Sequence, residues 1–168
     1  MKLTSPAFGN HTRIPRQYTG VGSDQSPPLA WADPPPGVQS FALICDDPDA
    51  PSRAHPRPEG PWVHWVIYNI PESVRKLPEA ILTDPEVELP PGAAQGKNDF
   101  ASPGNIGYRG PMPPTGSGPH RYIFRIYAVD RRLDLAPKDA NKQTLLAAMR
   151  GHVLAEAALT AIFERESS

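Results

Sequence analysis

Three stretches of the chain have the hydrophobic patterning of β-strands. The first, from Ser40 to Asp46, is apolar on both faces, with one face carrying Phe41, Leu43 and Cys45 and the other Ala42 and Ile44. A run that is apolar on both sides is typical of a buried central strand. We expect this strand to end at Pro48, because proline cannot continue a central sheet ladder.

The second and third stretches, Trp62 to Ile70 and His120 to Val129, are rich in β-branched and aromatic residues. A two-residue period predicts that the second strand has two faces, one with Trp62, His64, Val66 and Tyr68 and the other with Val63, Trp65 and Ile67. In the third strand, the same period puts His120, Tyr122, Phe124 and Ile126 on one face and Arg121, Ile123, Arg125 and Tyr127 on the other. A histidine and a tyrosine should therefore lie side by side where this strand begins.

After Pro137 the pattern changes to one typical of helices. Proline is absent from this segment, and Ala, Leu, Glu, Lys and Gln are frequent. One apolar face is formed by Leu145, Leu146 and Met149, and a second by Val153, Leu154, Ala157, Ala158, Ala161 and Ile162. The segment predicts two helices, or one helix broken near Gly151, packed on a β core.

Composition supports a mainly β domain with long loops. The 168 residues include 23 prolines, a share nearly three times the usual ~5%, and proline disrupts helix interiors. The polar stretch from Pro51 to Pro61 and the Gly- and Pro-rich stretch from Gly96 to Gly118 predict loops. Loops as long as the stretch from Gly96 to Gly118 are often functional. The length predicts a single domain over residues 1–168.

Charge and targeting signals narrow the function classes. The 17 basic and 18 acidic residues give a net charge of -1, whereas nucleic-acid binders usually carry a basic excess. The sequence has no signal-peptide pattern and no apolar run of ~18 residues. We therefore expect a cytoplasmic protein without nucleic-acid partners or stable membrane insertion. Cys45 is the single cysteine, so no intrachain disulfide or cysteine-based zinc cluster can form.

Polar residues at the ends of the three strands are candidates for a binding site. Asp47 and Asp49 follow the first strand, His64 lies near the start of the second, and His120 and Tyr122 open the third. Imidazole N–H groups, a phenol hydroxyl and loop amides can donate to an anion, while a carboxylate beside a histidine fixes its tautomer. The set predicts recognition of an oxyanion or phosphate without a P-loop or a G-x-G-x-x-G fingerprint.

Catalytic interpretations of the same residues each lack a part. Two histidines with one or two aspartates could ligate a metal, but their wide spacing forms no short ligand motif, and we expect neither metal nor cofactor. A Ser-His-Asp hydrolase usually carries G-x-S-x-G, which is absent, and Gly116-Ser117-Gly118 is more simply a turn. Cys45 lies in an apolar strand and is interpreted as a small buried hydrophobe.

The chain resembles the phosphatidylethanolamine-binding protein family, also called Raf kinase inhibitor protein-like, in its bacterial and archaeal branch. The resemblance covers nearly the whole chain. Its motifs are S-P-P-L-A-W from Ser26, D-P-D-A-P from Asp47, W-V-H-W from Trp62, G-K-N-D from Gly96, the run from Gly107 to P-H-R-Y ending at Tyr122, and G-H-V-L-A-E-A from Gly151. The pairing of D-P-D-A-P with a later G-x-x-x-H-R-Y is specific.

The resemblance implies a fold of two β-sheets with a proline-rich loop over a small anion pocket and short C-terminal helices. It implies no general catalytic activity, and members often regulate partner proteins. The pocket residues that it implies are Asp47, Asp49, Trp62, His64, Gly110, Pro111, His120 and Tyr122. Arg121 belongs to the motif, but its strand face suggests a structural role behind the pocket. A cis proline is expected in or near D-P-D-A-P, and Pro48 is the candidate.

The sequence departs from the commoner bacterial pattern around the expected pocket mouth. The loop from Ser52 to Pro61 is longer, and Met112 replaces a cysteine or small residue. The leading hypothesis is a non-catalytic binding protein for a small phosphate- or carboxylate-bearing ligand, such as a phosphorylethanolamine-like headgroup, with regulation of a partner protein as a further role. A small-molecule hydrolase or lyase using the His and Asp residues, and an interaction module with a vestigial pocket, stay open as alternatives. A homodimer is also left open.

Overall fold

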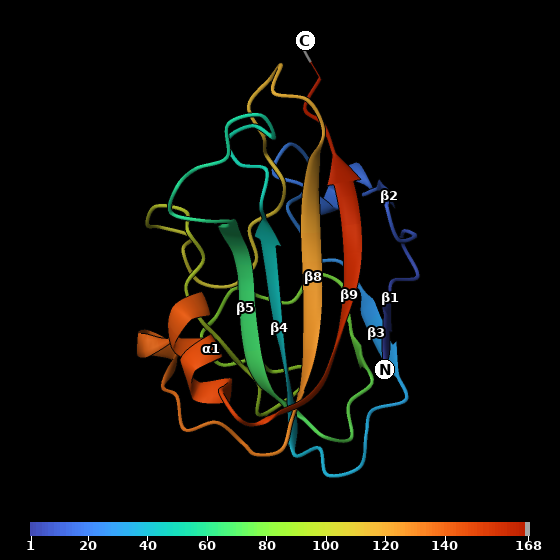
Figure 1. Cartoon of the computed structure of the whole chain (residues 1–168), viewed down its shortest axis with the longest axis vertical. Helices are drawn as coiled ribbons and strands as arrows, with labels where there is room; N and C mark the ends of the chain where they lie inside the picture. The colour runs from blue at the N-terminus through green and yellow to red at the C-terminus, as the bar shows by residue number, and fades with distance from the viewer. Residues whose placement is uncertain (167–168) are drawn as a thin grey trace.

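The chain folds into two β-sheets and one α-helix, and the computed structural model describes residues 1–166 (Figure 1). The larger sheet has six strands in the order β2-β9-β8-β4-β5-β7, and the smaller has three in the order β1-β3-β6. The mainly β fold expected from the sequence is confirmed. The elements are β1 (Lys2–Thr4), β2 (Thr12–Arg13), η1 (Arg16–Tyr18), β3 (Leu29–Ala32), β4 (Ser40–Asp47), β5 (Trp62–Pro71), β6 (Lys76–Leu77), β7 (Ala94–Gln95), β8 (His120–Val129), η2 (Pro137–Asp139), α1 (Lys142–Met149) and β9 (Val153–Phe163).

Strand β4 is the buried centre of the larger sheet, as its two-sided apolar pattern predicts. It pairs antiparallel with β5 on one side and with β8 on the other. Phe41, Leu43 and Cys45 belong to one core, and Ala42 and Ile44 to another. Because both neighbours run antiparallel to β4, the end of β4 lies beside the starts of β5 and β8. This geometry brings the three groups of polar residues to one edge of the sheet.

Each face of the larger sheet has its own cover. The small sheet contributes Leu3, Leu29, Trp31 and Leu77 to the core that contains Phe41 and the other residues of that β4 face. Helix α1 lies along the opposite face (Figure 1), where Leu145 and Met149 pack with Ile44, Val66 and Tyr68. The helix is capped by Asn141, whose side chain accepts from the Thr144 amide while Thr144 bonds back to the Asn141 amide.

The prediction of a second C-terminal helix is wrong, because residues Val153–Phe163 form β9. This strand pairs antiparallel with β8 from His120↔Phe163 to Val129↔Val153. Gly151, with a φ of 80°, lies in the turn that precedes the strand. The alanines give the segment a helical propensity that is weak beside the ladder bonds and burial that β8 offers, so tertiary pairing decides the outcome. Leu146, which was expected on the apolar face of α1, is 38% exposed.

A β-bulge changes the predicted faces of β5. Cys45 pairs with Trp65, but the next residue, Asp46, pairs with Val63, so the register shifts and His64 has no residue directly opposite it. Val63 therefore joins Val66 in the helix-side core, whereas strict alternation would have separated them. Bulges re-aim side chains in this way. His64 instead meets Tyr122 of β8, with the ring centroids 5.1 Å apart.

The two predicted loops surround the upper end of the sheet in Figure 1. Residues 51–61 contain one isolated bridge, Pro51↔Pro56, and residues 96–118 contain another, Lys97↔Ile106. The cis peptide bonds of the described residues are Ala50–Pro51, Leu89–Pro90 and Ser102–Pro103. The motif D-P-D-A-P thus holds a cis proline at Pro51, and the assignment of the cis bond to Pro48 is wrong.

Candidate functional site

A cavity of about 230 Å³ lies where β4 ends and β5 and β8 begin. Its polar lining comes from Asp47 of β4, His64 of β5, and His120 and Tyr122 of β8. The remaining wall is apolar or aromatic and consists of Ala50, Pro51, Trp62, Phe100, Met112, Pro113 and Pro114. A few convergent polar groups in an otherwise apolar hollow are typical of small-ligand sites.

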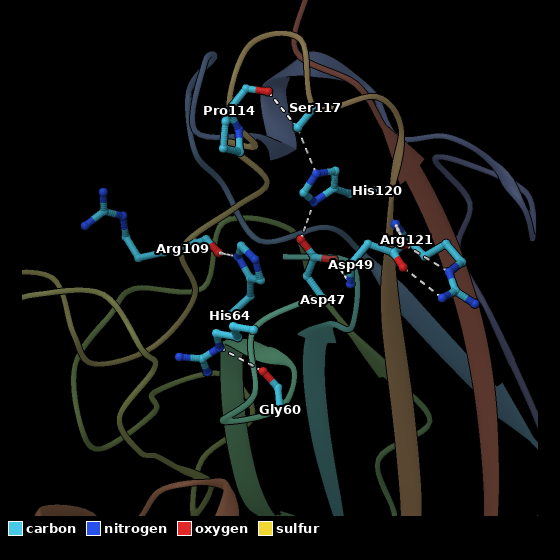
Figure 2. Close-up of polar contacts among 10 residues, drawn as sticks. Asp47, Asp49, Gly60, His64, Arg109, Pro114, Ser117, His120 and Arg121 are labelled. Atoms are coloured by element: carbon cyan, nitrogen blue, oxygen red, sulfur yellow. Dashed lines mark hydrogen bonds and ion pairs between the residues drawn. The ribbon is translucent and has the colours of Figure 1, made fainter. Parts of the chain in front are cut away.

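The innermost polar contacts form a chain of three side chains (Figure 2). Asp47 Oδ2 lies 2.6 Å from His120 Nδ1, and His120 Nε2 lies 3.0 Å from Ser117 Oγ. The Asp47 and His120 side chains are only 4% and 1% exposed. Since an ionised carboxylate can only accept, His120 Nδ1 carries the proton in this pair. Asp47 Oδ1 is also occupied, because it accepts from the Asp49 amide at 2.7 Å.

His64 presents its second ring nitrogen to the cavity. Its Nδ1 lies 2.6 Å from the carbonyl oxygen of Arg109 (Figure 2), and a carbonyl can only accept, so Nδ1 carries a proton. Burial lowers the pKa of His64, although the Arg109 carbonyl and the carboxylates of Asp47, Asp24 and Asp46 oppose the shift. His64 is therefore neutral at neutral pH, and its Nε2 holds a lone pair. This nitrogen can accept a hydrogen bond from a ligand, or it can take up a proton and then donate to an anion.

Tyr122 supplies a hydroxyl donor. Burial first, and the nearby Asp47 carboxylate second, raise the pKa of Tyr122 well above its usual value. The phenol therefore keeps its proton throughout the physiological range. Its ring stacks on His120 with the centroids 6.3 Å apart, as the shared strand face predicts.

Aromatic side chains build the outer wall. Phe100 lies edge-on to both Trp62 and His64, with centroid separations of 5.4 Å in each case. Two arginines cover these rings, Arg57 at 4.8 Å from the Trp62 centroid and Arg109 at 4.8 Å from the Phe100 centroid. Arg57 is also paired with Asp99 at 2.8 Å, and Arg109 with Asp24 at 3.1 Å. The positive charges near the mouth are thus partly compensated.

Asp49 lies outside the cavity wall and joins β4 to β8. Its Oδ1 accepts from Arg121 Nη2 at 2.8 Å, and its Oδ2 accepts from Arg121 Nε at 3.0 Å and from the Arg121 amide at 2.9 Å (Figure 2). Burial would raise the pKa of Asp49, but these bonds lower it overall. Both oxygens of this carboxylate accept from Arg121, which itself lies behind the pocket as its strand face suggests.

Gly110 and Pro111 also lie outside the cavity wall and anchor the loop that leads to it. The Gly110 amide donates to Asp24 Oδ1 at 2.6 Å, and the Pro111 carbonyl accepts from the Gly20 amide at 2.8 Å. A side chain at Gly110 would collide with the Tyr18 carbonyl and with Thr19 Cα, which is 2.9 Å from the Cβ position. Glycine is needed here for the close approach of two backbones.

The structure thus divides the residues expected in the pocket into two groups. Asp47, Trp62, His64, His120 and Tyr122 line the cavity. Asp49, Gly110 and Pro111 hold the surrounding segments in place. Sequence reasoning missed the contributions of Ala50, Pro51, Phe100, Pro113 and Pro114 to the wall and treated Ser117 only as a turn residue. The dense prolines of the 96–118 loop could have indicated the wall, but no sequence signal indicates Phe100.

Two further features bear on the chemistry. Within residues 1–166, no group of three or more His, Cys, Asp or Glu side chains is arranged to hold a metal ion. Cys45 is buried in β4, and burial, with Asp46 and Asp47 nearby, raises the pKa of its thiol well above the usual value. The thiol is therefore held in its unreactive protonated form.

The structure is thus a two-sheet β fold with a small cavity at one sheet edge, where Pro113 and Pro114 of a proline-rich loop form part of the wall. The sequence pattern of the phosphatidylethanolamine-binding protein family matches residues 4–164. The chain belongs to this family.

Relatives and solved structures agree with this assignment and include archaeal and bacterial proteins. A UPF0098 protein of Methanothermobacter thermautotrophicus is 49% identical over 98% of this chain and 99% of its own length, and a UPF0098 protein of Aquifex aeolicus is 40% identical over 99% and 90%. The crystal structure of E. coli YbcL, described as a new member of the mammalian PEBP family, has a TM-score of 0.85 at 29% identity, covering 98% of each chain. A putative phosphatidylethanolamine-binding protein homologue of Chlamydia trachomatis has a TM-score of 0.81 at 38% identity, covering 98% of this chain and 97% of its own.

No helix within residues 1–166 combines the length and the apolar character needed to cross a membrane.

Proposed function

We propose that the chain is a binding protein for a small phosphate- or carboxylate-bearing ligand, which it holds in the cavity at the ends of β4, β5 and β8. The observation that carries the proposal is the pair of complementary groups at the cavity surface. Tyr122 keeps its hydroxyl proton, which is within reach of Asp47 and can be donated to a ligand instead, and the second nitrogen of His64 can accept from a protonated oxyanion or donate after protonation. A hydrogenphosphate, which both donates and accepts, matches the two groups together.

The volume and the wall of the cavity support a headgroup-sized ligand. About 230 Å³ is below the usual range for drug-sized ligands, which begins near ~300 Å³. The aromatic edges of Trp62 and Phe100 can contact the carbon atoms of a short alkyl or ethanolamine portion. Asp47 adds no free negative charge toward the ligand when His120 is protonated, because the two side chains then neutralise each other.

The finer part of the proposal is that the cavity binds its small anionic ligand without turning it over, and that the occupied protein regulates a partner protein. The surface around the mouth supports a partner contact. Met112 is 44% exposed although it lines the cavity, and the long loop at residues 52–61 carries the exposed Arg53 and His55. A partner that touches this rim can sense the ligand directly. Ligand-dependent retention of a partner on the immobilised protein, lost when phosphate is omitted, is the expected behaviour.

Isothermal titration with inorganic phosphate, phosphorylethanolamine and acetate tests the proposal. We expect phosphate and phosphorylethanolamine to bind the wild type and to stabilise it by mass action, by about 2.7 kcal/mol at 100 times Kd. His64→Gln keeps the size of the side chain but cannot take up a proton, so phosphate affinity should fall.

The matched control is His152→Gln. His152 also pairs with a carboxylate, Asp130, at 2.8 Å, but it lies at the opposite end of β8 and β9. This variant should bind phosphate as the wild type does. No heat and no stabilisation with any of the three anions, or equal loss in both variants, would reject the proposed site.

A further inference from the structure

The side chains Ser117, His120 and Asp47 have the mutual geometry of a nucleophile, a general base and an orienting carboxylate. Ser117 Oγ lies 3.0 Å from His120 Nε2, and His120 Nδ1 lies 2.6 Å from Asp47 Oδ2 (Figure 2). Both distances fall within the hydrogen-bond reach that proton transfer requires. Ser117 lacks the G-x-S-x-G context, but such a triad is recognised by geometry and not by sequence order.

The turn that carries Ser117 leaves this residue partly exposed. Gly116 and Gly118 on either side both have a φ of 82°, a backbone conformation that favours glycine. A Cβ atom at Gly116 would meet nothing within 4 Å, so the approach to the serine is open there. His120, in contrast, is buried at 1% exposure. An accessible hydroxyl backed by a buried imidazole and carboxylate is the arrangement that an activated serine needs.

The hydroxyl proton has two acceptors, and the charge of His120 decides between them. Ser117 Oγ also lies 2.7 Å from the Pro114 carbonyl oxygen, to which it can donate. When His120 is protonated, Nε2–H donates to Oγ and the hydroxyl donates to Pro114. When His120 is neutral with its proton on Nδ1, Nε2 is a lone pair that accepts from the hydroxyl. The neutral form is thus the one that can withdraw the serine proton.

We propose that Ser117 is a nucleophile that accepts acyl groups from esters, with His120 as its general base and Asp47 as the residue that positions His120. In the first step, Oγ forms a bond to the ester carbonyl carbon while its proton passes to His120 Nε2. The carbon–oxygen bond to the leaving alcohol then breaks, and the alcohol takes the proton from Nε2. Water attacks the acyl-serine by the same proton route and restores Ser117, so that no oxidant, reductant or metal is required.

The adjoining cleft indicates which esters fit. A cleft of about 650 Å³ shares Met112 with the anion cavity and is lined by Thr115, two residues before Ser117. Glu164 of this cleft has Oε2 3.9 Å from the Cβ position of Gly118. Three arginines, Arg13, Arg16 and Arg165, line the cleft against two glutamates, Glu164 and Glu166. The excess of one positive charge favours an ester that carries a carboxylate or phosphate.

Covalent labelling of the full chain with a fluorophosphonate probe tests the nucleophile. We expect one adduct, located on Ser117 by peptide mass analysis, and labelling at least on the order of 100-fold slower in Ser117→Ala. Ser117→Ala alters an accessible turn and should fold normally. Ser52→Ala is the control, because Ser52 lies in another loop, where its Oγ accepts from the His55 amide, and it should label as the wild type does.

Hydrolysis of two p-nitrophenyl esters, an acetate and a succinate monoester, tests the base and the substrate class. His120→Gln should reduce hydrolysis of both, and Arg16→Gln should reduce the succinate rate relative to the acetate rate. The groups around His120 are Asp47 from β4, His64 from β5 and Tyr122 on its own strand, while Asp49 and Arg121 neutralise each other. Asp47→Asn should displace the pH profile of the hydrolysis rate, which a purely structural role would not do.

Failure of this inference is separable from failure of the binding site. If wild type binds phosphate but neither acquires an adduct nor hydrolyses either ester faster than Ser117→Ala, Ser117 is not a nucleophile. An adduct on a residue other than Ser117 leads to the same conclusion.

Discussion

The two faces of the larger sheet carry adjacent buried aspartates that have different partners. Asp46 points to the helix-covered face, where its Oδ2 lies 2.7 Å from Lys142 Nζ of α1. Asp47 points to the cavity, where its Oδ2 lies 2.6 Å from His120 Nδ1. Both aspartate side chains are 4% exposed. The two aspartates are therefore equally buried, and they differ in the basic side chain with which each is paired.

The basic partner determines whether the charges of an ion pair stay constant near neutral pH or can change when a ligand binds. A lysine stays charged near neutral pH, so the Asp46 pair is permanent and its role is to hold α1 on the sheet. Imidazole is the side chain whose charge a ligand can change most readily near neutral pH, and the cavity is lined by two histidines, His64 and His120. Only the cavity face can therefore exchange protons with a ligand. The helix face is closed by packing, whereas the other face has the cavity at the same end of β4.

The largest effect on stability is expected at the Asp49–Arg121 ion pair, which holds the turn after β4 against β8. Asp49 is 2% exposed and makes three bonds to Arg121. Asp49→Asn should lower the free energy of unfolding by about 3 kcal/mol, because it removes the charge of a buried carboxylate that accepts three hydrogen bonds from the partly exposed Arg121. The measurement is urea unfolding at pH 7.

The acid dependence of Asp49→Asn gives an independent check. Because the pKa of Asp49 is lowered in the folded state, its contribution is present above the unfolded carboxyl pKa and is lost as the pH falls through the folded value. The difference between wild type and variant should shrink toward zero in acid. Arg13→Gln is the control, since the Arg13–Glu166 pair is largely exposed and should contribute little. A constant difference across pH would contradict the ion-pair account.

Much of the strand arrangement around the cavity could be predicted from the sequence. The two-sided pattern of Phe41 to Cys45 identified the central strand, and the alternation in β8 placed His120 beside Tyr122. The segment Val153–Phe163 was misjudged because its alanines fit a helix locally and a strand only when β8 is beside it. Local patterns reflect intrinsic propensity, whereas the pairing of β9 with β8 is a tertiary interaction that these patterns do not contain.

The next effect concerns the permanent donor of the cavity. Tyr122→Phe removes the hydroxyl and keeps the ring against His120 and His64. Hydrogen bonds to charged groups contribute about 1.5–3 kcal/mol, so phosphate affinity should fall roughly 10- to 100-fold, as measured by isothermal titration. Tyr127→Phe, on the other face of β8, is the matched control and should change affinity little. Equal affinities for Tyr122→Phe and wild type would remove Tyr122 from the site.

The pH dependence of phosphate binding tests whether His64 takes up a proton when the ligand binds. The pKa of His64 is lowered from 6.5, so the ligand-free protein should lose stability as pH falls through 6.5, where the unfolded chain takes up the proton more readily. Bound phosphate that accepts a hydrogen bond from protonated His64 offsets this loss of stability. Its affinity should rise by up to about tenfold per pH unit on acidification, until phosphate itself gains a proton.

Thermal shift at fixed phosphate concentration between pH 5.5 and 8 would measure this coupling. His64→Gln should flatten the profile, whereas His152→Gln should leave it unchanged. A wild-type shift that is the same at all pH values would contradict proton exchange at His64.

The smallest effect is expected on the helix face. Lys142→Met removes the closest partner of Asp46 and leaves Arg125 at 3.9 Å. Because Lys142 is 24% exposed, water and Arg125 can compensate, and we expect a loss of about 1 kcal/mol in the free energy of unfolding. Phosphate affinity should not change. A loss of affinity in this variant would show that the two faces are coupled.

The site was less predictable than the fold. Asp49 resembles Asp47 in sequence, two residues along the same motif, yet it bonds Arg121 because the turn after β4 aims it behind β8. His64 was placed on the wrong face because a one-residue bulge cannot be detected from alternation. Ser117 occupies an unspecified position of G-x-x-x-H-R-Y, and the sequence does not show that the local turn brings its hydroxyl to His120 three residues later.

The most direct test of the central claim is the protonation state of His64 with and without phosphate, read from the ring ¹⁵N resonances by NMR at pH 7. We expect ligand-free His64 to be neutral with its proton on Nδ1, and phosphate to protonate Nε2 or to hydrogen-bond to it, with a shift absent at His152. Phosphate that binds while both His64 nitrogens keep their resonances would contradict the account.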